Sequence, residues 1–272
     1  MMKLTISIAQ MAVARSRPDE NLKKGEAFIA EAVKRKSDVV CFPEMWTTGF
    51  DWVSNERAAR EHEGVIERVG GLAKRYNIWI NGSMLALDEN GKVSNTSILF
   101  DSNGRKAGIY RKSHLFTMLH EDQHMAAGKY LCVVDTPWGL AGLSVCYDIR
   151  FPELFRTYAL RGVKMIFSPM AFPYPRLEHW KVLVRARAIE NQLFMIGTNQ
   201  VGSEDFGKDG VVTYFGDSVI IGPWGETVAE ANEKDETLVT ATIDVDKVDE
   251  VRNNMKVLRD RRPELYDLGG KE

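Results

Sequence analysis

Three side chains with complementary chemistry stand where apolar, strand-like runs of the sequence end. They are Glu44, Lys112 and Cys146. In α/β sheets, reactive groups gather at the carboxyl ends of strands, so we expect these three to meet. A carboxylate can take the proton of a thiol, and an ammonium group can hold the thiolate and the oxyanion that forms at the attacked carbon. The set therefore predicts nucleophilic catalysis by cysteine.

Cys146 lies at a predicted strand-to-helix junction. Polar residues follow it directly, and Pro152 and Glu153 then suit the first turn of a helix. Positive potential near a helix N-terminus lowers the pKa of a thiol, although most free cysteines are buried structural residues. If Cys146 is the nucleophile, the backbone N–H of Tyr147 is a natural second donor to the oxyanion.

Each of these residues also has an ordinary structural explanation when it is taken alone. Glu44 could be a solvated acid at a strand end, and Lys112 could be a surface cation; their joint occurrence with Cys146 favours catalysis. Arg150 could bind a substrate carboxylate through its planar guanidinium, or it could form a structural ion pair with a nearby acid. Phe172, Tyr174 and Arg176 follow another strand-like run, and we predict that they form a wall of the substrate pocket.

A rival motif occupies residues 120–124, whose sequence HEDQH matches the H-E-x-x-H pattern of zinc peptidases. On a helix, His120 and His124 would share a face and bind zinc, with Glu121 as the general base. The pattern is short, the surrounding sequence lacks helical periodicity, and no motif supplies a third ligand. We therefore predict no metal and no cofactor, and keep a zinc peptidase as the alternative from another class.

Strands and helices alternate through the chain in two similar halves. This order predicts two mixed sheets stacked face to face with helices outside, an α/β fold. Because no Pro-, Gly- or Ser-rich linker divides the halves, we predict one domain over residues 1–272, with 256–272 as a C-terminal arm. The expected strands are 5–11, 38–42, 78–87, 93–100, 109–110, 131–134, 140–146, 163–168, 193–198, 214–221 and 238–243, and the expected helices are 18–35, 57–76, 152–160, 177–191 and 245–255.

Composition narrows the class of partner and the compartment. The 272 residues carry a net charge of −2 (36 basic, 38 acidic), which favours neither nucleic acid nor an anionic membrane. No apolar run approaches the roughly 18 residues of a membrane span, and the N-terminus does not resemble a secretory signal. The three cysteines cannot form a disulfide framework, so we expect a cytoplasmic protein.

Six stretches resemble conserved motifs of the nitrilase superfamily of carbon–nitrogen hydrolases. The resemblance implies a four-layer αββα sandwich and a Glu–Lys–Cys triad with Glu44 as general base, Lys112 as oxyanion and thiolate stabiliser, and Cys146 as nucleophile. It also implies that Glu121 positions the substrate and the lysine. The matching stretches are FPEMWTTGF, YRKSHLF, LSVCYDIRFPELFR, MAFPYPRLEHW, RARAIENQ and DSVIIGPWGE.

Within the superfamily, the motifs are most similar to the omega-amidase branch. This implies hydrolysis of a small linear carboxylated amide, such as 2-oxoglutaramate, through a cysteine thioester with release of ammonia. It also implies a homodimer formed through helices near the one that begins at Pro152. An N-carbamoyl amino acid amidohydrolase with the same triad, and a non-catalytic binding protein on the same scaffold, remain the alternatives.

Overall fold

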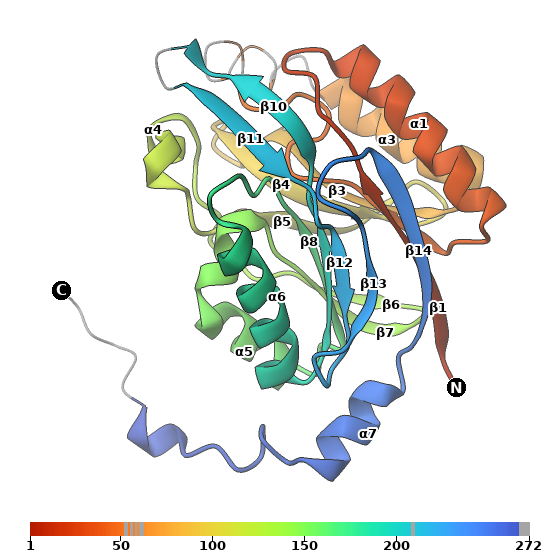
Figure 1. Cartoon of the computed structure of the whole chain (residues 1–272), viewed down its shortest axis with the longest axis vertical. Coiled ribbons are helices and arrows are strands. Elements are labelled where there is room, and N and C mark those ends of the chain that lie inside the picture. Colours follow the sequence, from red (N-terminus) through yellow and green to blue (C-terminus); the bar gives the residue numbers. More distant parts are fainter. Residues whose placement is uncertain (52–53, 55–56, 58, 60–62, 208–209, 267–272) are drawn as a thin grey trace.

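Two six-stranded mixed sheets pack face to face, and pairs of helices cover their outer faces (Figure 1). This computed structural model describes residues 1–51, 54, 57, 59, 63–207 and 210–266. The layers follow the order helix, sheet, sheet, helix, so the predicted αββα class is confirmed. Within the described ranges, no helix is long and apolar enough to cross a bilayer.

The first sheet is formed mainly by the N-terminal half of the chain. Its first three strands in sequence order run parallel, and α1 (Pro18–Lys34) and α3 (Glu63–Tyr76) pack on its outer face. The predicted helix 57–76 is α3, and most of the residues before Glu63 in that prediction lie outside the described residues. The strand order is β14 (Thr237–Asp244), β1 (Lys3–Gln10), β2 (Val39–Cys41), β3 (Trp79–Leu87), β4 (Val93–Phe100) and β5 (Lys106–Arg111).

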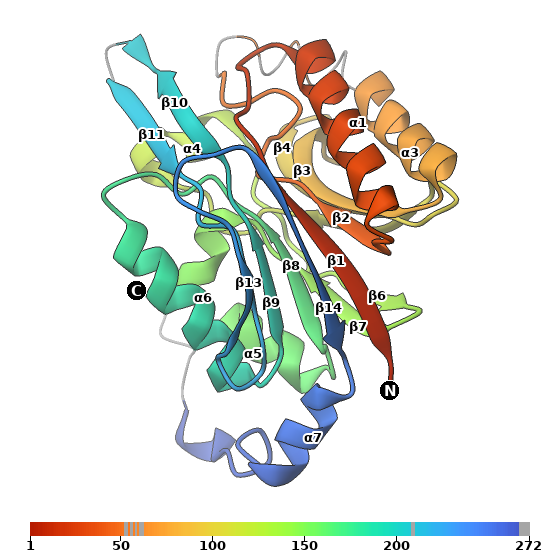
Figure 2. The same cartoon turned by 45° about the vertical axis from the view of Figure 1, so that its right-hand side comes forward.

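The second sheet is covered by α5 (Pro152–Leu160) and α6 (Leu177–Asn191), as Figure 2 shows from the side. A side chain added at Gly197 would lie 2.6 Å from the ring of Trp180, so glycine lets α6 sit directly on the sheet. The strand order is β13 (Thr227–Glu230), β12 (Val219–Ile221), β9 (Phe194–Thr198), β8 (Met165–Pro169), β7 (Gly139–Leu143) and β6 (Val133–Thr136).

The sequence of the short strand β2 is continuously apolar because both of its faces are covered. Val39 and Cys41 point into the core between the sheets, whereas Val40 and Phe42 pack beneath α1 and α3. Successive side chains of a strand face opposite sides, so a strand covered on both faces needs apolar residues throughout. This burial fixes the end of β2, from which Glu44 projects.

One predicted strand is wrong, because residues 214–221 form two separate strands. Gly216 and Asp217 have positive φ values of 69° and 56°, which interrupt the extended chain. β11 (Val211–Phe215) pairs with β10 (Val201–Asp205) in a two-stranded sheet of its own, where a loop was expected from residue 204, and β12 joins the second sheet. Figures 1 and 2 show this hairpin standing beyond the sandwich.

The chain ends with α7 (Lys247–Asn254) and a segment that runs along the bottom of the molecule in Figure 1. Within the predicted arm 256–272, residues 263–265 form a short 3-10 helix, and residues 267–272 lie outside the described residues.

Candidate active site

The three predicted catalytic side chains lie together at one cavity between the two sheets. Glu44 follows β2, Lys112 follows β5 and Cys146 lies three residues after β7. All three line a cavity with an empty volume of about 480 Å³. The structure therefore brings together residues from both halves of the chain, which the strand-end argument and the family resemblance had each grouped.

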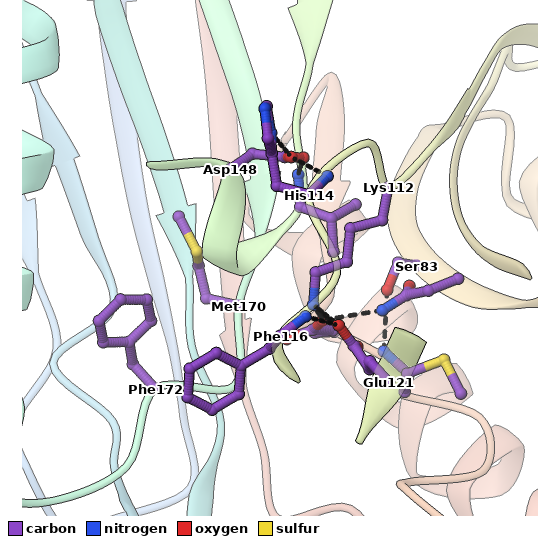
Figure 3. A network of polar contacts seen from close by, with 12 residues as sticks. Ser83, Lys112, His114, Phe116, Glu121, Asp148, Met170 and Phe172 are labelled. Atoms are coloured by element: carbon purple, nitrogen blue, oxygen red, sulfur yellow. Dashed lines mark hydrogen bonds and ion pairs between the residues drawn. The ribbon is translucent and has the colours of Figure 1, made fainter. Parts of the chain in front are cut away.

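Lys112 is the centre of a buried ionic cluster. Its Nζ donates hydrogen bonds of 2.9 Å to Oε1 of Glu44 and 2.8 Å to Oε1 of Glu121, and each of the three residues is at most 2 % exposed. Burial lowers the pKa of Lys112, but the two carboxylates outweigh that effect and raise it above its usual value. Glu121 also accepts the N–H of Phe116 at 2.7 Å, which anchors it (Figure 3).

Glu44 is held from two further directions. The side-chain amide of Asn95 on β4 donates to Oε1 of Glu44 at 2.8 Å, and the backbone N–H of Glu44 donates to the carbonyl of Met170 at 3.1 Å. Burial raises the pKa of this carboxyl; Lys112 opposes the shift and Glu121 adds to it. A carboxylate with a raised pKa is a better proton acceptor for a thiol than an ordinary surface acid.

Cys146 opens a short 3-10 helix, η2 (Cys146–Arg150), with a φ of 42°. A positive φ is uncommon for a residue other than glycine and stores strain of about 1–3 kcal/mol. Burial raises the pKa of the thiol and Glu44 adds to this shift, while Lys112 and the N–H of Ala171 lower it. Burial and Glu44 therefore favour the protonated form of the thiol, and Glu44 is the carboxylate that interacts with it.

The predicted substrate-binding residues Arg150, Phe172 and Arg176 all line the same cavity, whereas Tyr174, predicted with them, is half-exposed and lies outside its lining. The guanidinium of Arg150 lies 5.6 Å from the ring of Phe172, and that of Arg176 lies 5.6 Å from the ring of Phe116. In the part of the chain that the structure describes, neither arginine forms an ion pair with a carboxylate, so the structural ion pair considered for Arg150 is not observed. Its polar neighbour is instead His179, at 3.4 Å.

Some residues at the cavity carried no signal in the sequence. Tyr214 and Val212 come from the β10–β11 hairpin and form one wall, although this segment was not predicted to reach the site. Asn95 donates a hydrogen bond to Glu44, and the N–H of Ala171 lowers the pKa of Cys146. A polar residue in a strand and a backbone amide are indistinguishable from many others until the fold places them.

The HEDQH segment does not have the geometry of a zinc peptidase site. His120 has a left-handed conformation with φ of 59°, outside the helix α4, which spans only Glu121–His124. The carboxylate of Glu121 points inward to Lys112 instead of toward a position between the histidines. Thus the residue that the zinc hypothesis needs as a base belongs to the ionic cluster.

The sequence model of the carbon–nitrogen hydrolases matches residues 5–253. The chain belongs to the carbon–nitrogen hydrolase family. It is 37 % identical to a 2-oxoglutaramate amidase of Bacillus subtilis, over 97 % of this chain and 100 % of the relative, and 31 % identical to an omega-amidase of Xenopus tropicalis over the whole of both chains. A carbon–nitrogen hydrolase of Helicobacter pylori superposes with a TM-score of 0.89 at 26 % identity, covering 97 % of each chain.

Membership of the carbon–nitrogen hydrolases confirms the resemblance seen in the motifs. It also decides between the classes of protein considered from the sequence. The chain is an enzyme that hydrolyses carbon–nitrogen bonds, and the non-catalytic scaffold and the zinc peptidase find no support.

Proposed function

We propose that this carbon–nitrogen hydrolase is an omega-amidase that releases ammonia from a small dicarboxylate monoamide such as 2-oxoglutaramate. The observation that carries the proposal is the pair Arg150 and Arg176, which line the cavity of Cys146 without a carboxylate partner among the described residues. Guanidinium groups bind carboxylates bidentately, so the pair suits a substrate with an acid group away from the amide. The Bacillus subtilis relative named for 2-oxoglutaramate supports this choice.

In the first half of the reaction, Glu44 takes the thiol proton while Sγ of Cys146 attacks the amide carbon. Lys112 Nζ and the N–H of Tyr147 stabilise the oxyanion; this N–H lies in the first turn of η2, where backbone donors have no partner within the helix. Glu44 then passes its proton to the nitrogen, the C–N bond breaks, and ammonia leaves a thioester on Cys146.

In the second half, Glu44 accepts a proton from a water molecule that attacks the thioester. A second oxyanion forms at the same donors, and the C–S bond breaks. The thiolate recovers the proton, so the products are ammonia and a dicarboxylate. Glu121 keeps Lys112 in place through both halves by its hydrogen bond to Nζ.

Ammonia release from 2-oxoglutaramate tests the proposal directly. We expect turnover that Cys146→Ala abolishes and that a metal chelator leaves unchanged. Preferential turnover of N-carbamoyl amino acids would favour the carbamoyl alternative, and binding without turnover of either class would contradict the proposal.

The arginines are tested with Arg150→Ala and Arg176→Ala. Each should raise KM for 2-oxoglutaramate by about 10- to 100-fold, the equivalent of a charge-assisted hydrogen bond, and raise KM for an uncharged short amide much less. Arg161→Ala, an exposed arginine at the end of α5, is the matched control. Equal changes for charged and uncharged amides would remove the assigned role.

We further propose a cytoplasmic homodimer formed through α5 and α6, with the arm 256–272 contributing. Support comes from exposed apolar side chains on these helices, namely Leu160, Val182 and Ile189, and from three free cysteines, which suit a reducing compartment. Light scattering should give a dimer at micromolar concentration, and Val182→Glu should weaken it. The chain should also unfold in one transition, as one domain over 1–272.

A further inference from the structure

Asp148 is a buried carboxylate, two residues after Cys146, that none of the steps above uses. Its exposed fraction is 0 %, and no lysine or arginine of the described chain pairs with it. Four hydrogen bonds reach it. Oδ2 accepts from Tyr110 Oη at 2.8 Å and from the N–H of Val145 at 2.9 Å, and Oδ1 bonds the N–H of His114 at 3.1 Å and its ring Nδ1 at 2.7 Å.

The donors flank the two catalytic strand ends. Tyr110 and His114 lie two residues before and two residues after Lys112, and Val145 immediately precedes Cys146. β5 belongs to the first sheet and β7 to the second, and no main-chain hydrogen bond connects the described residues 110–116 with 143–148. The carboxylate of Asp148 makes that connection, as Figure 3 shows beside Lys112.

The four hydrogen-bond donors around this side chain favour an acidic residue at position 148. Tyr110 and the backbone amides of His114 and Val145 are donors, and the ring of His114 can donate from Nδ1. An ionised carboxylate offers about four acceptor sites, whereas an asparagine would turn an NH2 group toward two of these donors. The bond to Val145 also fixes the turn in which Cys146 adopts its strained φ of 42°.

We propose that Asp148 is a positioning residue. It connects the two sheets and so keeps Lys112 Nζ and Cys146 Sγ in the relative positions that catalysis requires. The inference rests on the proposed roles of these two residues in hydrolysis. Asp148 does not contact the substrate; it acts through the chain on either side of the lysine and through the turn that presents the thiol. A displacement of about 1 Å at such a position is enough to slow catalysis about 100-fold.

The test compares Asp148→Asn and Tyr110→Phe with Tyr158→Phe. Tyr158 is also a buried tyrosine, but its hydroxyl donates to the carbonyl of Leu143 at the end of β7 and accepts from the N–H of Cys132. It therefore contacts the β7 side alone and does not connect it with the residues that flank Lys112. We expect kcat to fall about 100-fold in Asp148→Asn and about 10-fold in Tyr110→Phe, with KM within about threefold of the original value. Tyr158→Phe should lower the melting temperature without this loss of kcat.

A second readout needs no substrate. The rate at which iodoacetamide alkylates Cys146, measured against pH, reports the ionisation of the thiol. Because Lys112 lowers the pKa of Cys146, a displaced lysine should move the alkylation profile of both variants to higher pH. An unchanged profile, with kcat reduced no more than in Tyr158→Phe, would overturn the inference.

The two readouts separate this inference from the proposed function. If 2-oxoglutaramate is not the substrate, the alkylation profile still reports whether Asp148 places Lys112 beside Cys146. If Asp148→Asn does not fold, Tyr110→Phe, which removes one hydroxyl and leaves the carboxylate, decides the outcome.

Discussion

The side-chain amide of Asn95 donates a 2.8 Å hydrogen bond to Oε1 of Glu44, the same oxygen that accepts from Lys112. Two donors on one oxygen fix the carboxylate and leave Oε2 for the thiol proton in the proposed mechanism. Burial raises the pKa of Glu44, and Lys112 opposes that rise. A hydrogen bond to a carboxylate favours its ionised form, so the bond from Asn95 acts in the same direction as Lys112.

Asn95→Ala should therefore reduce kcat by about 10- to 100-fold, since a hydrogen bond to a charged group contributes about 1.5–3 kcal/mol. With one donor lost, the pKa of Glu44 rises further, so the acidic limb of the kcat/KM profile should move to higher pH. Asn81→Ala is the control, because Asn81 on β3 is also buried but bonds Ser97 and the carbonyl of Ile98. Equal pH profiles for the two variants would contradict this role.

Glu121→Gln tests the second carboxylate on Lys112. Glutamine keeps the shape of the side chain, but its NH2 group must face one of two donors, either Lys112 Nζ or the N–H of Phe116. We expect kcat to fall about 10- to 100-fold, measured as ammonia release. Asp122→Asn, at the exposed neighbouring position, should leave kcat unchanged, and a Glu121→Gln enzyme within twofold of the original would refute the assignment.

The β10–β11 hairpin should make stability depend on pH through Glu204. Burial raises the pKa of this carboxyl to about 7, although Arg15 lies 3.5 Å away and lowers it. The folded state therefore holds a proton that the unfolded state releases near pH 4.5, so this contribution to stability is full below that pH. It is lost as the pH rises to about 7. Glu204→Gln should raise the melting temperature, relative to the original protein, more at pH 8 than at pH 5. An equal change at both pH values would exclude this effect.

Alanine at the two adjacent glycines of α3, Gly70 and Gly71, should change the free energy of unfolding in opposite directions. A Cβ at Gly70 would lie 2.8 Å from the carbonyl oxygen of Gly104, whereas a Cβ at Gly71 would meet nothing within 4 Å. Gly71→Ala should stabilise the protein by about 1 kcal/mol through helix propensity. Gly70→Ala gains the same propensity but forces α3 away from the turn at Gly104, at a cost of about 1–3 kcal/mol. Urea unfolding measures both, and equal signs would contradict the close approach.

The sequence predicted those parts of the fold that local patterns encode. Local sequence predicted the apolar run of β2, the helix after Pro152 and the reactive residues at three strand ends. Burial on both faces of a strand and the preferences of a first helical turn each require particular residue types, which can be recognised in the sequence. These local patterns identified Glu44, Lys112 and Cys146 as candidates, but they gave no distances between the three side chains.

The remaining parts of the site depend on contacts that no local pattern records. Asn95 donates a hydrogen bond to Glu44, which lies 51 residues away in the sequence. Asp148 accepts hydrogen bonds from His114 and Tyr110, which lie 34 and 38 residues away. A polar residue in a strand reads as solvent-facing until the partner sheet covers it. The hairpin was missed for a related reason. β10 is mostly polar and exposed, so it lacks the apolar alternation by which a strand is recognised, and the apolar end of β11 was interpreted as the start of a longer strand.

The hairpin has a consequence for how this enzyme could diversify. It belongs to neither large sheet, yet it supplies Tyr214 and Val212 to the wall of the cavity. Tyr214 is buried, whereas Val212 is only partly buried, so mutations at Val212 can reshape this wall and retune substrate choice with little effect on the sandwich or the ionic cluster. A library at Val212 and its exposed neighbours Val211 and Thr213 is therefore a direct route to variants of this enzyme that accept other amides.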